Sequence, residues 1–322
     1  MRLSIALASY NGNLFLNEQI RSIINQSVLP EELIVSDDYS SDKTNDCLAG
    51  WETRCPFDYH ILRQSRNVGV VSNFSTAISA CKGDVIVLAD QDDAWYPHKL
   101  SRIRDAFARD ASVGLVFSDA DLVDQDLKPL GRTLWQSIGF NEAERAQIRT
   151  PWGFDLLLRR FLVTGATLAF RRSLLELVLP ISKHLIHDAW IAIAAAAVSK
   201  IECIEEPLIQ YRQHPNQQIG ERGQWNNWRS QWRAAKSITP NYFQKQKLFF
   251  SDLADHLNRF SSHWVHAKVG KLASQKVQHL ERRIAFREKK GCSYGGIAKE
   301  YLTGEYSRFS YGWKSAVQDV FS

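Results

Sequence analysis

The sequence has few cysteines, and their spacing suggests neither a disulfide framework nor a metal-bound one. Its 322 residues include five cysteines, an odd number with no C-x-x-C pair: Cys47, Cys55, Cys81, Cys203 and Cys292. Disulfide-rich domains and structural zinc sites need paired cysteines, so both classes are disfavoured. We expect a protein of a reducing compartment.

Long hydrophobic runs are also missing. The longest, Ala189–Val198, is too short to cross a bilayer core of about 30 Å. The chain opens with a strand-like run, Leu3–Ala8, and shows no secretory signal. We therefore expect a cytoplasmic protein, which can still lie as a peripheral protein on the inner face of the cytoplasmic membrane.

Charge is distributed unevenly along the chain, although the net value is only +5. Residues 220–322 carry 18 Lys and Arg against 8 Asp and Glu, whereas the preceding residues carry 22 against 27. A basic tail suits an anionic surface such as lipid headgroups, nucleic acid or a charged partner, and it also suits a solvated helical face. An acidic front part suits a metal site.

Strand-like and helix-like segments alternate up to Tyr211, which predicts an α/β fold with a mainly parallel sheet flanked by helices. We place a boundary near Gly220, with a catalytic domain at 1–220 and a basic, aromatic, helical region at 221–322. The expected strands are Leu3–Ser9, Glu32–Ser36, Tyr59–Gln64, Asp84–Ala89, Val113–Ser118, Val163–Phe170 and Ile201–Tyr211. The expected helices are 16–27, 41–51, 74–81 and 189–198.

Polar clusters follow three of these strands, namely Ser9–Asn11, Asp37–Asp38 and Asp90–Asp93. In parallel sheets, ligands bind beyond the carboxyl ends of the strands. Three carboxylates crowded at one strand end repel one another, and a cation relieves that repulsion. Oxygen ligands suit Mg²⁺ or Mn²⁺, which often bridge substrate phosphates. The alternative is a solvated acidic loop.

Seven short blocks stand in an order that resembles the family 2 glycosyltransferases, which have the GT-A fold, and within them the bacterial rhamnosyltransferase branch. The resemblance covers roughly residues 3–220. The blocks are Ala8–Gly12, Ile34–Asp42, Asn67–Gly69, Ala89–Trp95, Val163–Gly165, His187–Trp190 and Tyr211–His214.

The resemblance implies a role for each matching residue. For the nucleotide it implies contacts from Ser9, Tyr10, Asp38, Arg66, Asn67 and Asp90. For the metal it implies Asp92 and His214, and for the catalytic base Asp188. Further substrate contacts fall on Asp93, Trp95, Gly165, His187 and Trp190. Simpler interpretations stay open: Asp188 as a helix cap, Trp190 as a core aromatic and His214 as an ordinary buried or surface histidine.

Two positions depart from the family pattern. Tyr39 stands where the family commonly has Gly, so the turn after Asp38 is expected to differ. Ala189 follows the His187–Asp188 pair, where the rhamnosyl branch commonly shows the first of two aromatics. The sugar or acceptor pocket is therefore less well defined than the phosphate site.

Three tryptophans of the tail, Trp225, Trp228 and Trp232, fall at helical spacing beside Arg229 and Arg233. This pattern is typical of an amphipathic helix at a membrane surface, where the family's lipid-carried glycan acceptors lie. A helical lid or a dimer interface packed on the catalytic domain is the competing interpretation.

The predicted function is an inverting, metal-dependent transfer of a sugar to a growing glycan of a bacterial surface polysaccharide (O-antigen or capsule). The first expected donor is dTDP-L-rhamnose and the second a UDP-hexose. Nucleotidyl transfer is disfavoured because Ala8–Asn13 holds one Gly and no basic residue. A non-catalytic module that binds nucleotide or nucleic acid remains the rival of another class, although we expect no nucleic acid partner.

Overall fold

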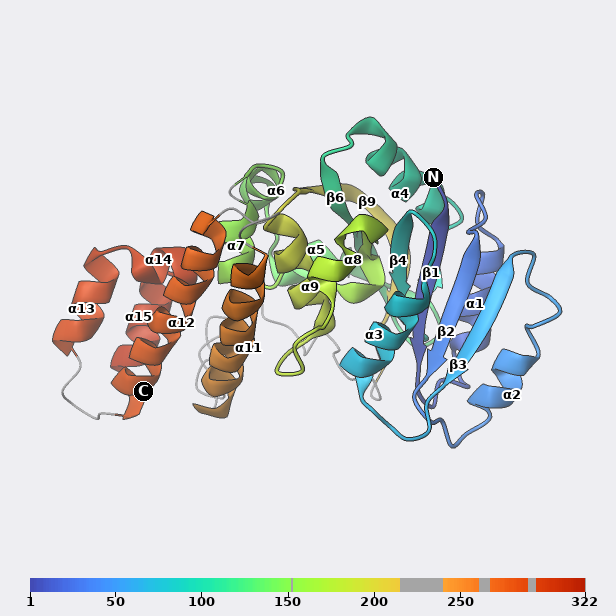
Figure 1. The fold of residues 1–322 in the computed structure, drawn as a ribbon, viewed down its shortest axis with the longest axis horizontal. Helices are drawn as coiled ribbons and strands as arrows, with labels where there is room; N and C mark the ends of the chain where they lie inside the picture. Colours follow the sequence, from blue (N-terminus) through green and yellow to red (C-terminus); the bar gives the residue numbers. More distant parts are fainter. Residues whose placement is uncertain (152, 215–239, 261–266, 289–293, 322) are drawn as a thin grey trace.

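The computed structural model describes residues 1–151, 153–214, 240–260, 267–288 and 294–321. A nine-stranded sheet runs through the first part of the chain, and helices cover it (Figure 1). The C-terminal helices extend from the end of the molecule opposite β3 (Figure 1).

Four strands form the parallel half of the sheet in the order β3-β2-β1-β4. They are β1 (Leu3–Ser9), β2 (Glu32–Asp37), β3 (Asp58–Arg63) and β4 (Val85–Ala89). The connecting helices are α1 (Leu16–Ile24), α2 (Thr44–Ala49) and α3 (Val70–Ala80). β1, β2 and β4 are buried along their whole length, which is why each has an apolar run on both faces rather than an alternating pattern.

The other half of the sheet is mixed. β8 (Leu168–Arg171) lies antiparallel between β4 and β6 (Val113–Val123), and β9 (Lys200–Arg212) runs parallel to β6. Two short strands, β5 (Ala94–Trp95) and β7 (Pro129–Thr133), pair antiparallel with β9 and β6. The helices of this half are α4 (Lys99–Arg109), α5 (Leu134–Ile138), α6 (Glu142–Ile148), α7 (Gly153–Arg159), α8 (Leu175–Val178) and α9 (His187–Ala196).

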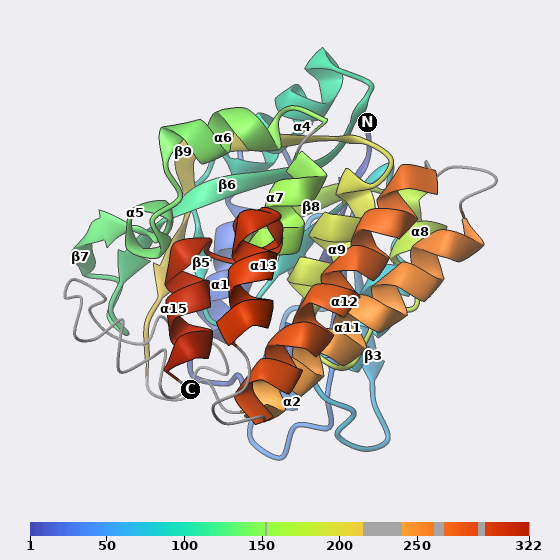
Figure 2. The same cartoon turned by 90° about the vertical axis from the view of Figure 1, so that its left-hand side faces the viewer.

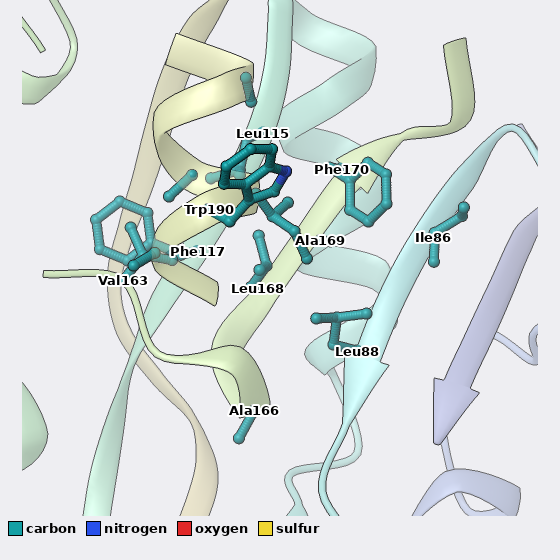
Figure 3. Close-up of a cluster of buried hydrophobic side chains, with 14 of the residues drawn as sticks. Ile86, Leu88, Leu115, Phe117, Val163, Ala166, Leu168, Ala169, Phe170 and Trp190 are labelled. Atoms are coloured by element: carbon teal, nitrogen blue, oxygen red, sulfur yellow. The ribbon is translucent and has the colours of Figure 1, made fainter. Parts of the chain in front are cut away.

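The predicted fold class is confirmed, with one local correction. The strand expected at Val163–Phe170 begins only at Leu168, because Gly165–Thr167 form a 3₁₀ turn. Side chains from β4, β6, β8 and α9 meet in the core above this turn, with Trp190 of α9 beside Leu115 and Phe117 (Figure 3).

The C-terminal helices are α11 (Pro240–Arg259), α12 (Ala267–Glu288), α13 (Tyr294–Leu302), α14 (Glu305–Phe309) and α15 (Trp313–Val320). α11 and α12 lie side by side in both views (Figures 1 and 2). Phe249 of α11 packs edge-on against Trp190, with ring centroids 5.8 Å apart, and His256 Nε2 lies 2.7 Å from the Leu177 carbonyl oxygen. α11 and α12 therefore share one hydrophobic core with the sheet domain.

The boundary near Gly220 and the tail residues Trp225, Trp228, Arg229, Trp232 and Arg233 lie outside the described residues. The two-domain division and the membrane contact of this tail therefore stay predictions. Within the described part of the chain, no helix has the length and apolar character needed to cross a bilayer.

Candidate active site

The polar clusters at the ends of β1, β2 and β4 come together, because these strands are neighbours and parallel. The first two ends are joined directly. Ser9 Oγ donates to Asp37 Oδ1 at 2.9 Å, and the Asn11 N–H donates to Ser40 Oγ at 2.9 Å. Ser9 is 1% exposed, so its side chain joins the two strands, and its predicted nucleoside contact stays a prediction.

Gln91 ties the acidic motif to the turn after β1. Its side-chain oxygen accepts from the Tyr10 N–H at 2.8 Å, and its amide nitrogen donates to the Tyr10 carbonyl at 3.0 Å. The side chain lies so close to Gly12 that a Cβ there would stand 2.2 Å from the Gln91 oxygen. Sequence reasoning gave Gln91 no role. The only sequence feature that indicates a role for Gln91 is its position between Asp90 and Asp92.

Asp38 organises the loop that precedes α3. It is 2% exposed, and its two carboxylate oxygens accept from the N–H groups of Val68 at 2.6 Å and Gly69 at 2.9 Å. The Asn67 amide lies 3.5 Å from the Asp38 carbonyl oxygen, and the Arg66 side chain is exposed. Four residues predicted to contact the nucleotide, Tyr10, Asp38, Arg66 and Asn67, thus lie on connected loops.

The carboxylates of Asp90, Asp92 and Asp93 occupy different environments. Asp92 Oδ2 lies 2.9 Å from His214 Nε2, which joins two residues 122 positions apart. Asp93 is fully buried; its Oδ1 accepts from the Arg212 N–H at 3.0 Å, and its Oδ2 has no partner among the described residues. Burial, followed by the charges of Asp92 and Asp188, raises the pKa of Asp90 to about 7. Burial and its two acidic neighbours also raise the pKa of Asp93 well above its ordinary value.

Two buried basic side chains support this cluster, and sequence reasoning missed both. Lys99 donates from Nζ to the Ala166 carbonyl at 2.7 Å, and Nζ lies 3.8 Å from the centroid of the Trp95 ring. Arg212, 1% exposed, donates from Nε to the Asp92 carbonyl at 2.6 Å and pairs through Nη2 with the Glu18 carboxylate at 2.5 Å. The sequence signal for Arg212 was its place two residues before His214 in one of the seven blocks.

The arrangement fits a divalent cation that is shared with a diphosphate. Asp92 and His214 supply one carboxylate and one imidazole, and Mg²⁺ or Mn²⁺ commonly takes only one or two protein ligands together with substrate phosphate oxygens. Among the described residues, the one group of three possible metal ligands is His279, Glu300 and Glu305. Their ligand atoms all lie within 4.8 Å of one another. Arg282 pairs with both of those glutamates, so a guanidinium already supplies the positive charge there.

Asp188 is the second residue of α9 and is 8% exposed. Its Oδ2 accepts from the Gly165 N–H at 3.0 Å and its Oδ1 from the Ala189 N–H at 2.6 Å. Burial raises its pKa to about 6, although these hydrogen bonds lower it. Ile186 is the N-cap residue, so Asp188 is not the cap. The negative charge of Asp188 is one cause of the raised pKa of Asp90, so the two carboxyl groups lie near enough to interact.

His187 is a buried polar side chain without a hydrogen bond. Its ring stacks on Phe74 with centroids 4.1 Å apart, and neither ring nitrogen has a partner among the described residues. Burial lowers its pKa to about 3, so the ring is neutral. A Cβ on Gly165 would stand 2.8 Å from His187 Nε2, so only a glycine allows this approach. Unsatisfied polar atoms of this kind are uncommon in folded proteins and are consistent with a ligand contact.

The structure corrects the predicted substrate contact of Trp190. Its side chain is 2% exposed, and its Nε1 donates to the Val178 carbonyl at 2.8 Å within the core. Residues two positions apart on a helix point to different sides, so the face that carries Asp188 is not the face that carries Trp190. Trp95 is likewise buried, at 4% exposed, with the Lys99 Nζ over its ring.

A half-parallel, half-mixed sheet with an acidic motif after β4 defines a protein of the GT-A fold class. Residues 4–174, more than half of the chain, match the family model described as Glycosyl transferase family 2. The chain belongs to this family.

Two curated relatives share the same region. One, "Uncharacterized glycosyltransferase alr2836" of Nostoc, is 29% identical over 66% of this chain and 65% of its own length. The other, "dTDP-rhamnosyl transferase RfbG" of Shigella flexneri, is 26% identical over 66% of this chain and 73% of its own length. The match thus covers less than two thirds of the Nostoc relative.

Two solved structures show the fold at low sequence identity. S. aureus TarS 1-349 in complex with UDP-GlcNAc has a TM-score of 0.58 and 15% identity, over 99% of this chain and 82% of that one. The mannosyltransferase PcManGT from Pyrobaculum calidifontis, in complex with GDP-Man and Mn2+, has a TM-score of 0.52 and 16% identity, over 99% and 86%.

Proposed function

We propose that this protein is an inverting, metal-dependent glycosyltransferase that moves a sugar from a nucleoside-diphosphate donor to a glycan acceptor. The Asp92–His214 pair, 2.9 Å apart, and the buried carboxylate of Asp188 carry the proposal, since the charges of both Asp92 and Asp188 act on Asp90. The Asp92–His214 pair suits a metal–diphosphate complex, and the Asp188 carboxylate suits a proton acceptor.

The donor nucleotide binds at the ends of β1 and β2. Tyr10, 39% exposed, offers a ring face to the base, and Asp38 offers carboxylate lone pairs that its two backbone hydrogen bonds leave free. A base with an N–H donor, such as uracil or thymine, matches that acceptor. Arg66 and Asn67 lie on the adjoining loop, where they meet the ribose or the phosphates.

Asp92 and His214 would hold the cation, with the carboxyl groups of Asp90 and Asp93 beside them in the same motif. When bound, Mg²⁺ or Mn²⁺ supplies positive charge that stabilises the departing diphosphate. Arg212 fixes the backbone of the motif through the Asp92 carbonyl and the Asp93 carboxylate. Gln91 then sets the distance between this motif and the nucleoside turn.

Asp188 takes the proton of the acceptor hydroxyl as the new bond forms at the anomeric carbon. A single displacement of this kind inverts the configuration at that carbon. The neutral ring of His187 and the backbone of Gly165 lie next to Asp188, and an unpartnered ring nitrogen of His187 contacts a sugar or acceptor hydroxyl.

The first donor we propose is dTDP-L-rhamnose, with a UDP-hexose as the second, and the acceptor is a growing surface polysaccharide. The similarity to the Shigella dTDP-rhamnosyl transferase supports the rhamnosyl donor. Asp38 accepts equally well from thymine and from uracil, so the site itself does not separate the two nucleotides.

A donor panel tests the proposal. The protein is incubated with dTDP-L-rhamnose, UDP-glucose, UDP-galactose, UDP-GlcNAc and GDP-mannose with Mn²⁺ or Mg²⁺, and release of the nucleoside diphosphate is followed. We expect slow hydrolysis of one thymidine or uridine donor that stops with EDTA. Turnover of the guanosine donor alone would contradict the proposed base site, and EDTA-resistant turnover would contradict the metal.

A further inference from the structure

Tyr39 adopts a backbone conformation that a bulky residue rarely takes. It follows Asp38 at the carboxyl end of β2, and its φ is +63°. In the left-handed region a Cβ crowds the following carbonyl oxygen, so a residue other than Gly, Asn or Asp is strained there. The resemblance to family 2 placed a Gly at this position, and the backbone indeed keeps the glycine-like conformation while the side chain is a tyrosine.

The hydrogen bonds around Tyr39 hold the turn in this conformation. The Ser40 N–H donates to Asp37 Oδ2 at 2.9 Å, and the Ser41 N–H donates to Asn11 Oδ1 at 2.9 Å. On the other side, the Asp38 carboxylate binds the N–H groups of Val68 and Gly69. The turn is therefore fixed between two loops, and surrounding structure of this kind is what allows a strained residue to persist.

The ring of Tyr39 contributes little to the fold. It is 61% exposed, and the described residues give it no hydrogen bond and no ring contact. A Gly at this position would remove the backbone strain and would lose almost no packing. Strained residues cluster at ligand sites, and the strain is then offset by what the side chain binds.

We propose that Tyr39 is a second aromatic residue of the nucleobase site, and that it forms with Tyr10 an aromatic pair at the ends of the adjacent strands β2 and β1. This inference rests on the proposed function. Tyr10 and Tyr39 are both exposed, Tyr10 directly after β1 and Tyr39 directly after Asp38 at the end of the neighbouring strand β2. Stacking on an aromatic face tolerates any base, so Tyr39 raises affinity and leaves base selection to Asp38.

The test compares Tyr39→Gly and Tyr39→Phe with the unchanged protein by calorimetric titration of UDP and dTDP in Mn²⁺, together with thermal unfolding. We expect Tyr39→Gly to weaken binding by roughly tenfold, as loss of one stacking partner does, while its unfolding midpoint stays equal or rises. Tyr39→Phe keeps the ring, and we expect its affinity to stay within about twofold.

The other outcomes contradict either the stacking role of Tyr39 or the proposed function. Nucleotide affinity that is unchanged in Tyr39→Gly overturns the inference and leaves the proposed function standing. Weaker binding with a lower unfolding midpoint shows a structural role and also overturns it. Equal losses in Tyr39→Phe and Tyr39→Gly assign the effect to the hydroxyl and overturn stacking. If the unchanged protein binds neither nucleotide, the proposed function fails, and Tyr39 loses its role with it.

Discussion

Asp188→Asn is expected to lower the rate of sugar transfer by roughly 10²- to 10⁴-fold, the usual range for removal of a general base. Asn has nearly the same size and keeps an oxygen for one of the two backbone N–H groups, of Gly165 and Ala189, but it cannot take a proton. Nucleotide affinity should stay within a few-fold, because the nucleotide contacts lie on other loops. The measurement is turnover of the donor identified by the panel, with binding measured on the same preparations.

The pH dependence of the unchanged protein follows from the same carboxyl group. Burial raises the pKa of Asp188 to about 6, and the base acts only when deprotonated. Turnover should therefore be flat above about pH 7 and fall as pH drops through about 6, approaching tenfold per pH unit. A profile that stays flat down to pH 5 would contradict the role of Asp188.

Asp119→Asn is the matched control. Asp119 is also a buried carboxylate, 6% exposed, and its Oδ1 accepts from the N–H groups of Ala120 and Trp135. This variant should keep its turnover. If both variants lose activity equally, the loss comes from disturbed packing of a buried aspartate and not from the loss of a base.

Arg212→Met is expected to lower the free energy of unfolding by about 2–4 kcal/mol and to weaken nucleotide binding in Mn²⁺. The Arg212 side chain donates to the carbonyls of Asp92 and Gln125, pairs with Glu18 and lies 4.4 Å from the Phe15 ring centroid. Met keeps much of the apolar stem but leaves the two carbonyls without their donors. This loss of stability is smaller than the loss expected from breaking a fully buried ion pair, because the Glu18 side chain is 50% exposed.

The matching surface control is Arg102→Met. Arg102 pairs with Glu206 at 2.8 Å, with side chains 49% and 40% exposed, and such pairs contribute at most about 1 kcal/mol. Urea unfolding of both variants gives the comparison. Equal, small changes in the two would show that Arg212 does not hold the acidic motif.

The sequence allowed the parallel half of the sheet to be predicted almost residue by residue. β1 matches its predicted range. β2 and β4 differ from theirs by one residue at one end, and β3 is shifted by one residue at both ends. Three of them, β1, β2 and β4, are buried on both faces, so their apolar runs are short and bounded by polar turns. The second half was harder to predict because polar residues continue its strands. β6 extends through Asp119 and Asp121 to Val123, beyond the predicted end at Ser118.

The candidate site was only partly visible in the sequence for a related reason. Motifs reveal residues that lie together along the chain, such as Asp90–Asp93, and the resemblance added Asp188 and His214. Lys99 and Arg212 act through contacts across the fold, with Ala166, Gln125 and Glu18, which no local pattern encodes. Trp190 failed as a substrate contact because an aromatic beside a motif is more often part of the core.

A calorimetric titration tests whether the ends of β1, β2 and β4 bind a metal–nucleotide complex. UDP and dTDP are titrated into the purified protein with Mn²⁺, with Mg²⁺ and with EDTA, and the series is repeated on Asp92→Ala. The account predicts that one of the two nucleotides binds with metal, that EDTA abolishes the binding, and that Asp92→Ala loses it while remaining folded. Failure of both nucleotides to bind under every condition, or binding that neither EDTA nor Asp92→Ala affects, would contradict the assignment of this site.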